Sequence, residues 1–308
     1  MSKIDKIEEL QNLLREDSQN FQARRQLAVL LTDCGFNEEA LKNLIYLSKT
    51  FTNDSGIFYN LGIVYEKLKN LKKAKESYEK AIEIEPEATD AIYNLGLVCT
   101  DLGEFQTAIK CFEKVISTDN EDSNSYFNLG LVYFKMKDFI PAIEYFQKTI
   151  DLNNEDVYAH FYLGNIYKEL GDSDAAREEF SIVIEISPDY SWAYYNIAVL
   201  DYENGDYDSA LDNLSRTVEL NPADIEAYKI CAKILIKIED YDYAHQVLDL
   251  ALQNCGENGD LYYILGRLFA LEGDDINYRI NLQNALKNYK TLSMSVPALK
   301  TELSKIKA

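Results

Sequence analysis

Histidine and cysteine are scarce in this chain of 308 residues, which narrows the chemistry that it can support. The two histidines are His160 and His245, and His160 occupies a place where other segments of the chain carry a packing aromatic. The five cysteines are odd in number and form no CxxC pair, so neither a zinc site nor a disulfide framework is expected. The signatures GxxxxGK[ST], GxGxxG, HExxH and GxSxG are also missing. We therefore expect no enzyme activity, no cofactor and no metal, and a reducing, cytoplasmic location.

Basic residues and long apolar runs are scarce as well. Lysine and arginine number 31 against 52 acids, which gives a formal net charge of −21. Such a charge repels phosphates and anionic lipids, and no run approaches the roughly 20 apolar residues of a membrane span. We expect neither nucleic-acid binding nor membrane insertion, and residues 1–17 do not resemble a secretory signal. The acidic surface suits either a soluble scaffold or the electrostatic steering of a basic partner.

Proline is rare too, and the glycines follow a strict spacing. With 5 prolines and 47% hydrophobic residues, the composition fits an ordered, all-helical protein. Ten of the 13 glycines fall on two phases of a 34-residue period. They are Gly62, Gly96, Gly130, Gly164 and Gly266 on one phase, and Gly35, Gly103, Gly171, Gly205 and Gly273 on the other. This period is the signature of a helix–turn–helix solenoid, a class that usually binds partners and rarely catalyses reactions.

Counting the period from residue 21 gives eight units, and we number the places within each unit from 1 to 34. The units are 21–54, 55–88, 89–122, 123–156, 157–190, 191–224, 225–258 and 259–292. Place 8 always holds glycine or alanine, place 20 holds alanine in seven units, and place 24 holds leucine, tyrosine or phenylalanine. Two helices cross closely only where a side chain is nearly absent, so we expect the two helices of a unit to cross here. The second glycine set falls at place 15, where a turn requires a left-handed backbone.

Two segments carry a specific resemblance. Tetratricopeptide repeats are what these segments resemble: FYNLGIVYEKLKNLKKAKESYEKAIEIEP (58–86) and YNLGLVCTDLGEFQTAIKCFEKVI (93–116). They show the family's pattern of an aromatic residue, a Leu-Gly pair and a tyrosine in the first helix, and of alanine, phenylalanine and alanine in the second helix. The resemblance extends over nearly the whole chain. It implies an all-α, right-handed superhelical α-solenoid in which first helices line the concave face and second helices form the convex face.

The two ends continue the phase in a degraded form. We expect residues 1–20 to form an N-terminal capping helix over 3–16, with Leu10 and Leu13 at core places. Residues 293–308 are expected to form a C-terminal capping helix over 296–307, with Val296, Leu299 and Leu303 at core places. Lys300 stands where a small residue is usual and would block another unit from stacking. Asp201 and Tyr278 also depart from the repeat and predict looser packing nearby.

The concave groove is the candidate binding site. In the family that the chain resembles, this face is built from places 2, 5, 6, 9, 12 and 13. The candidate groove residues are Tyr59, Asn60, Ile63, Tyr93, Asn94, Leu97, Phe127, Asn128, Leu131, Phe134, Phe161, Asn165, Tyr195, Asn196 and Tyr202. An asparagine ladder can hold the main chain of an extended peptide, and the aromatic and aliphatic residues add apolar contact. The alternative is that asparagine is merely the family consensus at place 6.

A row of bases interrupts this face in the seventh unit. Lys229, Lys233 and Lys237 recur every four residues at groove places, and Arg267 follows in the next unit. They predict a possible subsite for an acidic ligand, such as a carboxylate of the partner. The alternative is a solvated face that neighbouring acids neutralise. Ile264 stands where the family's clamp for chaperone tails needs a polar residue, so that clamp is not expected.

Taken together, these features favour a non-enzymatic scaffold or adaptor that holds a protein or peptide segment in its concave groove. One alternative is a structural arm of a larger complex or a self-assembling array, which allows a homo-oligomer. Another is an accessory subunit to a separate enzyme. The solvated second-helix places Glu76, Glu79, Lys80 and Glu83 argue mildly against self-assembly.

Overall fold

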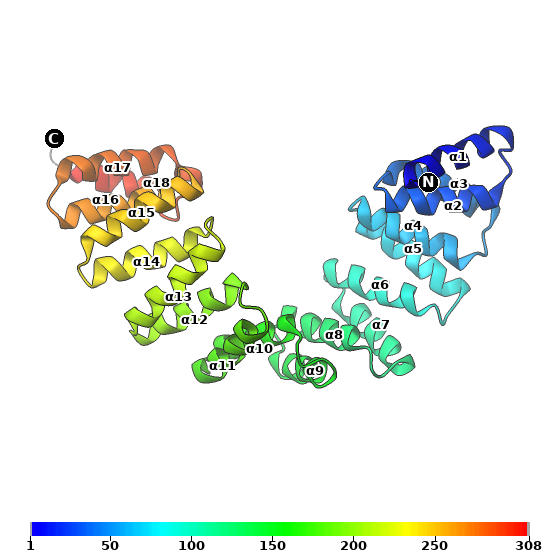
Figure 1. Cartoon of the computed structure of the whole chain (residues 1–308), viewed down its shortest axis with the longest axis horizontal. Coiled ribbons are helices and arrows are strands. Elements are labelled where there is room, and N and C mark those ends of the chain that lie inside the picture. The colour runs from blue at the N-terminus through cyan, green and yellow to red at the C-terminus, as the bar shows by residue number, and fades with distance from the viewer. Residues whose placement is uncertain (1, 307–308) are drawn as a thin grey trace. The chain divides into compact units, whose positions relative to one another are not determined.

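A computed structural model describes residues 2–306 of the chain, and within them the structure consists of helices and connecting turns without a strand (Figure 1). The elements are α1 (Lys3–Glu16), α2 (Phe21–Asp33), α3 (Asn37–Thr50), α4 (Ser55–Lys67), α5 (Leu71–Ile84), α6 (Thr89–Asp101), α7 (Phe105–Thr118), α8 (Ser123–Lys135), α9 (Phe139–Leu152), α10 (Val157–Leu170), α11 (Ser173–Ile186), α12 (Ser191–Asn204), α13 (Tyr207–Leu220), α14 (Ile225–Lys237), α15 (Tyr241–Cys255), α16 (Gly259–Leu271), α17 (Asp275–Lys287), the 3-10 helix η1 (Tyr289–Thr291) and α18 (Val296–Lys305). The predicted all-α, helix–turn–helix repeat fold is confirmed.

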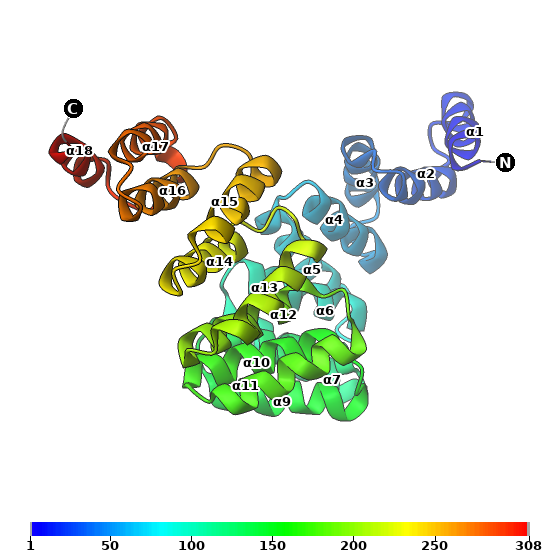
Figure 2. The same cartoon turned by 60° about the vertical axis from the view of Figure 1, so that its left-hand side comes forward.

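Each 34-residue unit contains one first helix and one second helix, from α2 and α3 to α16 and α17. The chain divides into two compact bodies, residues 1–159 and 160–308, and the boundary falls within α10. We call them the N-terminal body and the C-terminal body. Successive helices of the C-terminal body can be followed in Figure 2.

The crossing between the two helices of a unit explains the glycines at place 8. A Cβ built on Gly130 would lie 2.8 Å from the ring of Phe146, a distance that real Cβ atoms essentially never show. The same holds for Gly62 beneath Tyr78, Gly96 beneath Phe112 and Gly164 beneath Phe180. The predicted close approach is therefore confirmed, and its cause is an aromatic ring at place 24 of the same unit.

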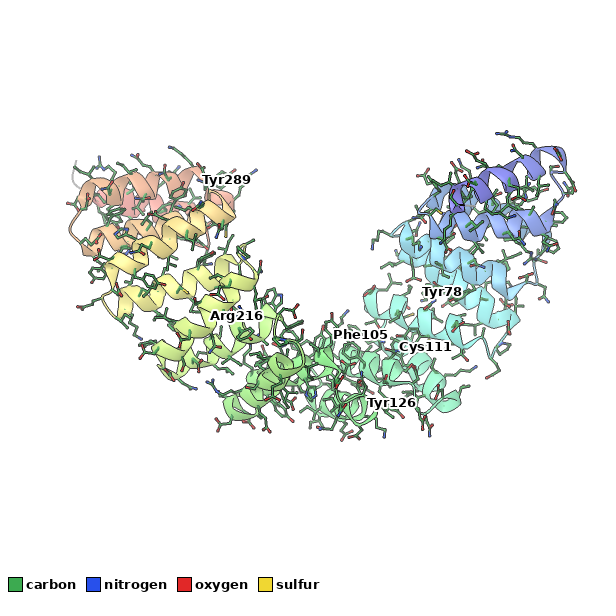
Figure 3. The ribbon with its side chains drawn as sticks, viewed as in Figure 1. Tyr78, Phe105, Cys111, Tyr126, Arg216 and Tyr289 are labelled. Carbon is green, nitrogen blue, oxygen red and sulfur yellow. The ribbon has the colours of Figure 1, made fainter. Side chains whose placement is uncertain are left out.

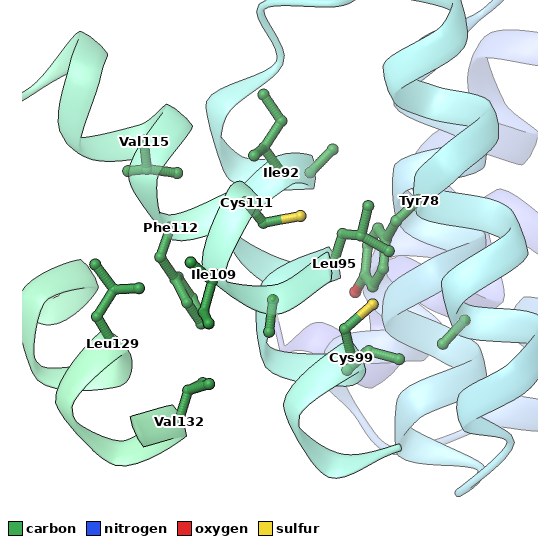
Figure 4. Packing of buried hydrophobic residues seen from close by; sticks show 14 of the residues in the cluster. Tyr78, Ile92, Leu95, Cys99, Ile109, Cys111, Phe112, Val115, Leu129 and Val132 are labelled. Carbon is green, nitrogen blue, oxygen red and sulfur yellow. The ribbon is translucent and has the colours of Figure 1, made fainter. Parts of the chain in front are cut away.

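The rings at place 24 also join one repeat to the next. In the buried cluster of Figure 4, Leu95 and Cys99 of α6 lie beside Tyr78 of α5. Phe112 of α7 faces Leu129 of α8 in the same way. The second helices α5 and α7 thus each place a large apolar side chain between their own first helix and that of the following unit, as in the nearest-neighbour core of a solenoid.

The turn between the two helices adopts the left-handed backbone that the sequence predicts at place 15. Gly35, Gly103, Gly171, Gly205 and Gly273 have φ values of 75–82°. Lys69, Lys137 and Glu239 occupy the same place in the remaining units, and their φ values of 59°, 59° and 64° show that the conformation does not depend on glycine. The backbone N–H of Asp138 donates to the carbonyl of Tyr133 at 3.0 Å, so the helix ends themselves hold the turn.

The two ends of the array need corrections to the predicted core. Leu10 is buried, but Leu13 is 39% exposed, and Ile7 is buried in its place. Leu14 packs against the same cluster as Ile7 and Leu10, so the buried stripe of α1 is rotated away from Leu13. In α18, Leu299 is fully buried and Lys300 is exposed, while residue 307 of the predicted helix lies outside the described residues.

The two departures from the repeat are held by polar contacts. Asp201 is only 1% exposed, and its carboxylate accepts hydrogen bonds from Arg177 and from Asn213. Tyr278 is buried and donates its hydroxyl to Glu302 of α18. Tyr278 also lines a hollow between α16, α17 and α18, in keeping with the looser packing predicted there.

Candidate functional site

The candidate groove residues of the N-terminal body lie on the first helices α4, α6 and α8, a surface that we call the first-helix face. The aromatic residues at place 5 are half-buried and contact the aromatic at place 24 of their own unit. Ring centroids are 5.9 Å apart for Tyr59 and Tyr78, 5.7 Å for Tyr93 and Phe112, and 5.6 Å for Phe127 and Phe146. The inner edge of each place-5 ring therefore belongs to the core, which fixes the ring, and the outer edge remains at the surface.

Asparagines at place 6 connect neighbouring repeats through these tyrosines. The side-chain amide of Asn128 donates to the Tyr93 hydroxyl at 2.9 Å, and the amide of Asn94 donates to the Tyr59 hydroxyl at 3.4 Å. Asn128 also donates to the carbonyl of Asn124, four residues earlier in its own helix. We call this arrangement the Asn–Tyr ladder.

The amide groups of the ladder are thus already used as donors. No described residue donates a hydrogen bond to the side-chain oxygens of Asn94 and Asn128, so these oxygens are free to accept one. Burial raises the pKa of Tyr59 and of Tyr93, although the asparagine bonds oppose this, and both hydroxyls keep a proton that can be donated. The ladder therefore offers alternating acceptors and donors.

Apolar side chains run alongside the ladder. Ile63, Leu97 and Leu131 at place 9 are half-buried, and Phe134 at place 12 lies 6.2 Å from Phe139 between ring centroids. Asn60 at place 6 of its unit donates to the carbonyl of Gly56 at 2.7 Å within α4. Unlike Asn94 and Asn128 it bonds no tyrosine, because place 5 of the preceding unit holds Arg25. The N-terminal body therefore brings ten of the predicted residues onto one row of first helices.

In the C-terminal body the same places are used differently. Phe161 has no hydroxyl to accept a bond from Asn196, and Lys168 instead donates to the Asn196 oxygen. The Asn196 amide donates to the carbonyl of Trp192 at 2.8 Å, and the side chain is only 4% exposed. The side chain of Asn196 thus has its amide and its oxygen bonded within the protein and presents little surface to a ligand.

The other predicted residues of this body remain at least partly accessible. Asn165 is half-buried and donates to the carbonyl of Phe161 at 2.9 Å. Tyr195 and Tyr202 are half-buried on α12, and Tyr202 lies 6.1 Å from Tyr207 between ring centroids.

The sequence analysis did not name Trp192 among the surface aromatics of the groove face. Trp192 stands at place 2 of its unit, is 52% exposed and packs edge-on to Tyr195 with ring centroids 6.0 Å apart. Its position at a groove place was a usable signal, because place 2 in most other units holds a small or polar residue.

Two of the four bases predicted as an acidic-ligand subsite are neutralised by ion pairs. Lys229 forms ion pairs with Glu226 at 2.8 Å and Asp260 at 3.0 Å. Arg267 pairs with Glu302 at 3.1 Å, and the Lys237 ammonium lies 5.0 Å from the centre of the Tyr207 ring. Lys233 is exposed and forms no ion pair with a described residue. The ion pairs favour the solvated, neutralised face at Lys229 and Arg267, and the acidic-ligand subsite stays a prediction at Lys233 and Lys237.

None of the helices in residues 2–306 combines the length and the apolar character needed to cross a membrane. Over the same residues, histidine, cysteine, aspartate and glutamate form no group of three or more that could hold a metal ion.

Comparisons with known proteins come from family models and from solved structures. Tetratricopeptide repeat models match residues 56–87, 164–205 and 192–224, and a model described as anaphase-promoting complex, cyclosome, subunit 3 matches residues 101–181. No curated protein matches the sequence.

Solved structures resemble the chain over more than half of its length. MamA residues 41 to the end from Desulfovibrio magneticus RS-1 are 26% identical, cover 56% of this chain and 97% of their own, and give a TM-score of 0.54. The C-terminal part of a TPR repeat-containing protein from Cytophaga hutchinsonii is 17% identical, with 87% and 96% covered and a TM-score of 0.58. A tetratricopeptide repeat protein from Parabacteroides merdae is 17% identical, with 81% and 97% covered and a TM-score of 0.57.

Proposed function

Because the chain belongs to the tetratricopeptide repeat family, whose members bind protein partners, we propose that it is a non-enzymatic adaptor that holds an extended segment of a partner protein. The proposed contact surface is the first-helix face of the N-terminal body, from Tyr59 to Phe134. The single observation that carries the proposal is the Asn–Tyr ladder. All five cysteines are free, which supports our expectation of a reducing, cytoplasmic location.

The ladder suits an extended peptide because each rung offers groups that a peptide main chain can use. The Asn94 and Asn128 oxygens would accept from peptide N–H groups, and the Tyr59 and Tyr93 hydroxyls would donate to peptide carbonyls. At about 0.5–1.5 kcal/mol for each bond, these contacts alone would barely offset the cost of association. The half-buried residues Ile63, Leu97 and Leu131 would supply the remaining affinity through apolar contact.

The test is a comparison of three baits in the same native lysate, with bound proteins identified by mass spectrometry. The first is the wild-type chain and the second is the double variant Asn94→Ala, Asn128→Ala. The third is the control Gln106→Ala, Gln147→Ala, which removes two exposed amides from the second helices α7 and α9 of the same body.

We expect a protein that the wild type and the control retain and that the asparagine variant loses. Removing both rungs should weaken binding of the purified partner by about tenfold or more. Circular dichroism should show a small fall in melting temperature, because two bonds between repeats are also lost. Equal protein lists from all three baits would rule out the ladder as the binding site.

A second candidate function is that of a structural subunit in a larger assembly. It is favoured by the match of residues 101–181 to the family model of an anaphase-promoting complex subunit. In this case the chain would co-sediment with several proteins at once, and the asparagine variant would leave their association unchanged.

A further inference from the structure

A groove of the C-terminal body lies between the second helices α13 and α15. It has a volume of about 510 Å³, and α14, which lies between these helices in Figure 1, forms its floor. Its lining residues include Leu211, Val218, Tyr243, Val247 and Leu250, together with Asp208 and Asp212. We call this the second-helix groove, and it shares no residue with the candidate site described above.

The α15 wall of the groove is apolar at two places where several other repeats carry polar residues. Tyr243 is 50% exposed and Leu250 is 44% exposed, and the half-buried Val247 lies between them on the same face of the helix. The places that Tyr243 and Leu250 occupy in their repeat are filled by Lys73 and Lys80 in α5, and by Thr107 and Lys114 in α7. Apolar side chains at residues i, i+4 and i+7 form the stripe that receives another helix.

The rim of the groove carries negative charge. Helices α13 and α15 together hold five carboxylates and one arginine, Arg216, which is labelled in Figure 3. Arg216 pairs with Glu219 of its own helix at 2.9 Å. Asp208 and Asp212 are exposed and form no ion pair with a described residue. A partner with basic residues would therefore meet two unneutralised carboxylates next to an apolar stripe.

We propose that the second-helix groove binds an amphipathic basic helix of a partner protein. Large apolar residues spaced by three or four positions would pack on Tyr243, Val247 and Leu250, and lysine or arginine beside them would reach Asp208 and Asp212. A second copy of this chain is a poor occupant, because two molecules of net charge −21 would bring carboxylates together. This proposal stands independently of the ladder, and it gives the protein a separate contact surface.

The probe is a fluorescein-labelled peptide of about 14 residues, or four helical turns, with leucine on one face and lysine elsewhere. Its binding to the full chain is followed by fluorescence anisotropy at two salt concentrations. Asp208→Asn with Asp212→Asn removes the rim charge. The matched control is Asp174→Asn with Glu178→Gln, which changes the same two places of the preceding second helix, α11.

We expect the rim variant to weaken peptide binding by about fivefold or more and to reduce its salt dependence. The α11 control should stay within about twofold of the wild type. Equal losses in the rim variant and the control would overturn the proposal, because they would show general attraction to an acidic surface.

A second pair of variants tests the apolar wall. Tyr243→Ser with Leu250→Ser should weaken binding by about tenfold. The control Ile276→Ser with Ile280→Ser alters two exposed apolar residues of α17 outside the groove and should leave the affinity unchanged. All four side chains are at least partly exposed, and circular dichroism checks that each variant is folded. If the α15 variant instead turned a wild-type dimer into a monomer in sedimentation, the occupant would be a second copy and the proposal would be wrong.

Discussion

Seven of the eight units have one of two kinds of helix crossing. The four units from residue 55 to residue 190 cross through glycine at place 8 beneath an aromatic at place 24. The units 21–54, 191–224 and 225–258 cross through alanine beneath leucine, with the pairs Ala28 and Leu44, Ala198 and Leu214, and Ala232 and Leu248. In these seven units a larger side chain on one helix accompanies a smaller one on the other, so the summed volume of the pair is maintained.

This difference in the core reaches the surface. In the glycine units, the ring at place 24 supports an aromatic at place 5, with centroid distances of 5.6–5.9 Å. In the alanine units, place 5 holds Arg25, Tyr195 and Lys229. The aromatic part of the candidate binding face is therefore largely built on the glycine crossings.

The junctions between repeats differ as well. In the C-terminal body, the acid of the connecting ion pair is largely buried, as in Arg177 with Asp201 and Lys229 with Asp260. In the N-terminal body, a pair such as Lys75 with Glu104 remains partly exposed. A buried carboxylate depends on its partner far more than an exposed one does.

The largest expected effect follows from removing the base beside a buried acid. Arg177→Met leaves Asp201 with only the hydrogen bond from Asn213, at 3.1 Å, inside the core. Breaking a buried pair on one side costs about 3–5 kcal/mol, and the partial exposure of Arg177 places this case near 3 kcal/mol. Urea unfolding followed by circular dichroism measures the change.

The double variant Arg177→Met, Asp201→Leu tests whether the uncompensated charge of Asp201 causes the loss of stability. Leucine occupies the place of Asp201 in the units 21–54 and 225–258, so this variant imitates a junction that the chain already contains. It should recover most of the lost stability. If it is as unstable as the single variant, the uncompensated charge is not the reason for the loss.

A smaller effect is expected from overfilling a glycine crossing. Gly130→Ala puts a Cβ 2.8 Å from the Phe146 ring, which costs about 1–3 kcal/mol and is partly offset by the roughly 1 kcal/mol gain in helix propensity. We expect a net loss of about 1–2 kcal/mol in urea unfolding. Adding Phe146→Leu converts the crossing to the alanine–leucine kind and should reduce the penalty.

Gly266→Ala is the control for this comparison. Gly266 is the one place-8 glycine that faces a leucine, and its added Cβ would lie 3.3 Å from Leu282 and from the Cβ of Asn281. We expect no loss of stability, and a gain of up to about 1 kcal/mol from helix propensity. If Gly130→Ala and Gly266→Ala lost equal stability, the summed volume of the residues at places 8 and 24 would not explain the choice of glycine.

The smallest expected effect depends on pH. Burial raises the pKa of Asp260, but the hydrogen bonds from Ser293 and Lys229 outweigh it and hold this pKa below its ordinary value of 3.8. An acid whose pKa is lowered on folding stabilises the folded state above that ordinary value, and the contribution disappears as the pH falls through the folded value. Asp260→Asn should therefore be less stable than the wild type near pH 6, and the difference should shrink below about pH 4.

The control for this test is Glu104→Gln, which breaks the more exposed pair with Lys75. Its effect on unfolding should stay within about 1 kcal/mol. A difference between Asp260→Asn and the wild type that stays constant from about pH 6 to pH 3 would show that the carboxylate charge contributes nothing.

The fold was predictable from the sequence because every repeat meets the same steric requirement. Two helices must approach closely at place 8, so glycine or alanine recurs there and reveals the period. The left-handed turn was predictable from five glycines, whereas its presence at Lys69, Lys137 and Glu239 was not. There the flanking helix ends impose the conformation on an unfavourable residue.

The candidate site was less predictable because it depends on partners in other repeats. Asn128 and Asn196 occupy the same place, yet one bonds a tyrosine hydroxyl and the other accepts a bond from Lys168, because Phe161 stands where Tyr93 stands. Lys229 looks like a binding residue in the sequence, and Asp260, 31 residues away, neutralises it. Periodicity shows which face a residue lies on, but it does not show how its polar groups are satisfied.

The exposure of Trp192 determines what the tryptophan fluorescence of this protein reports. It is the only tryptophan among the 308 residues, so intrinsic emission excited near the red edge reports one surface position on α12. Since its indole is already half in water, unfolding should shift the emission wavelength little, while the far-ultraviolet ellipticity of all the helices collapses. The same spectrum should respond strongly to a molecule that covers Tyr195 and Trp192, so the two optical signals separate occupancy of this surface from loss of the fold.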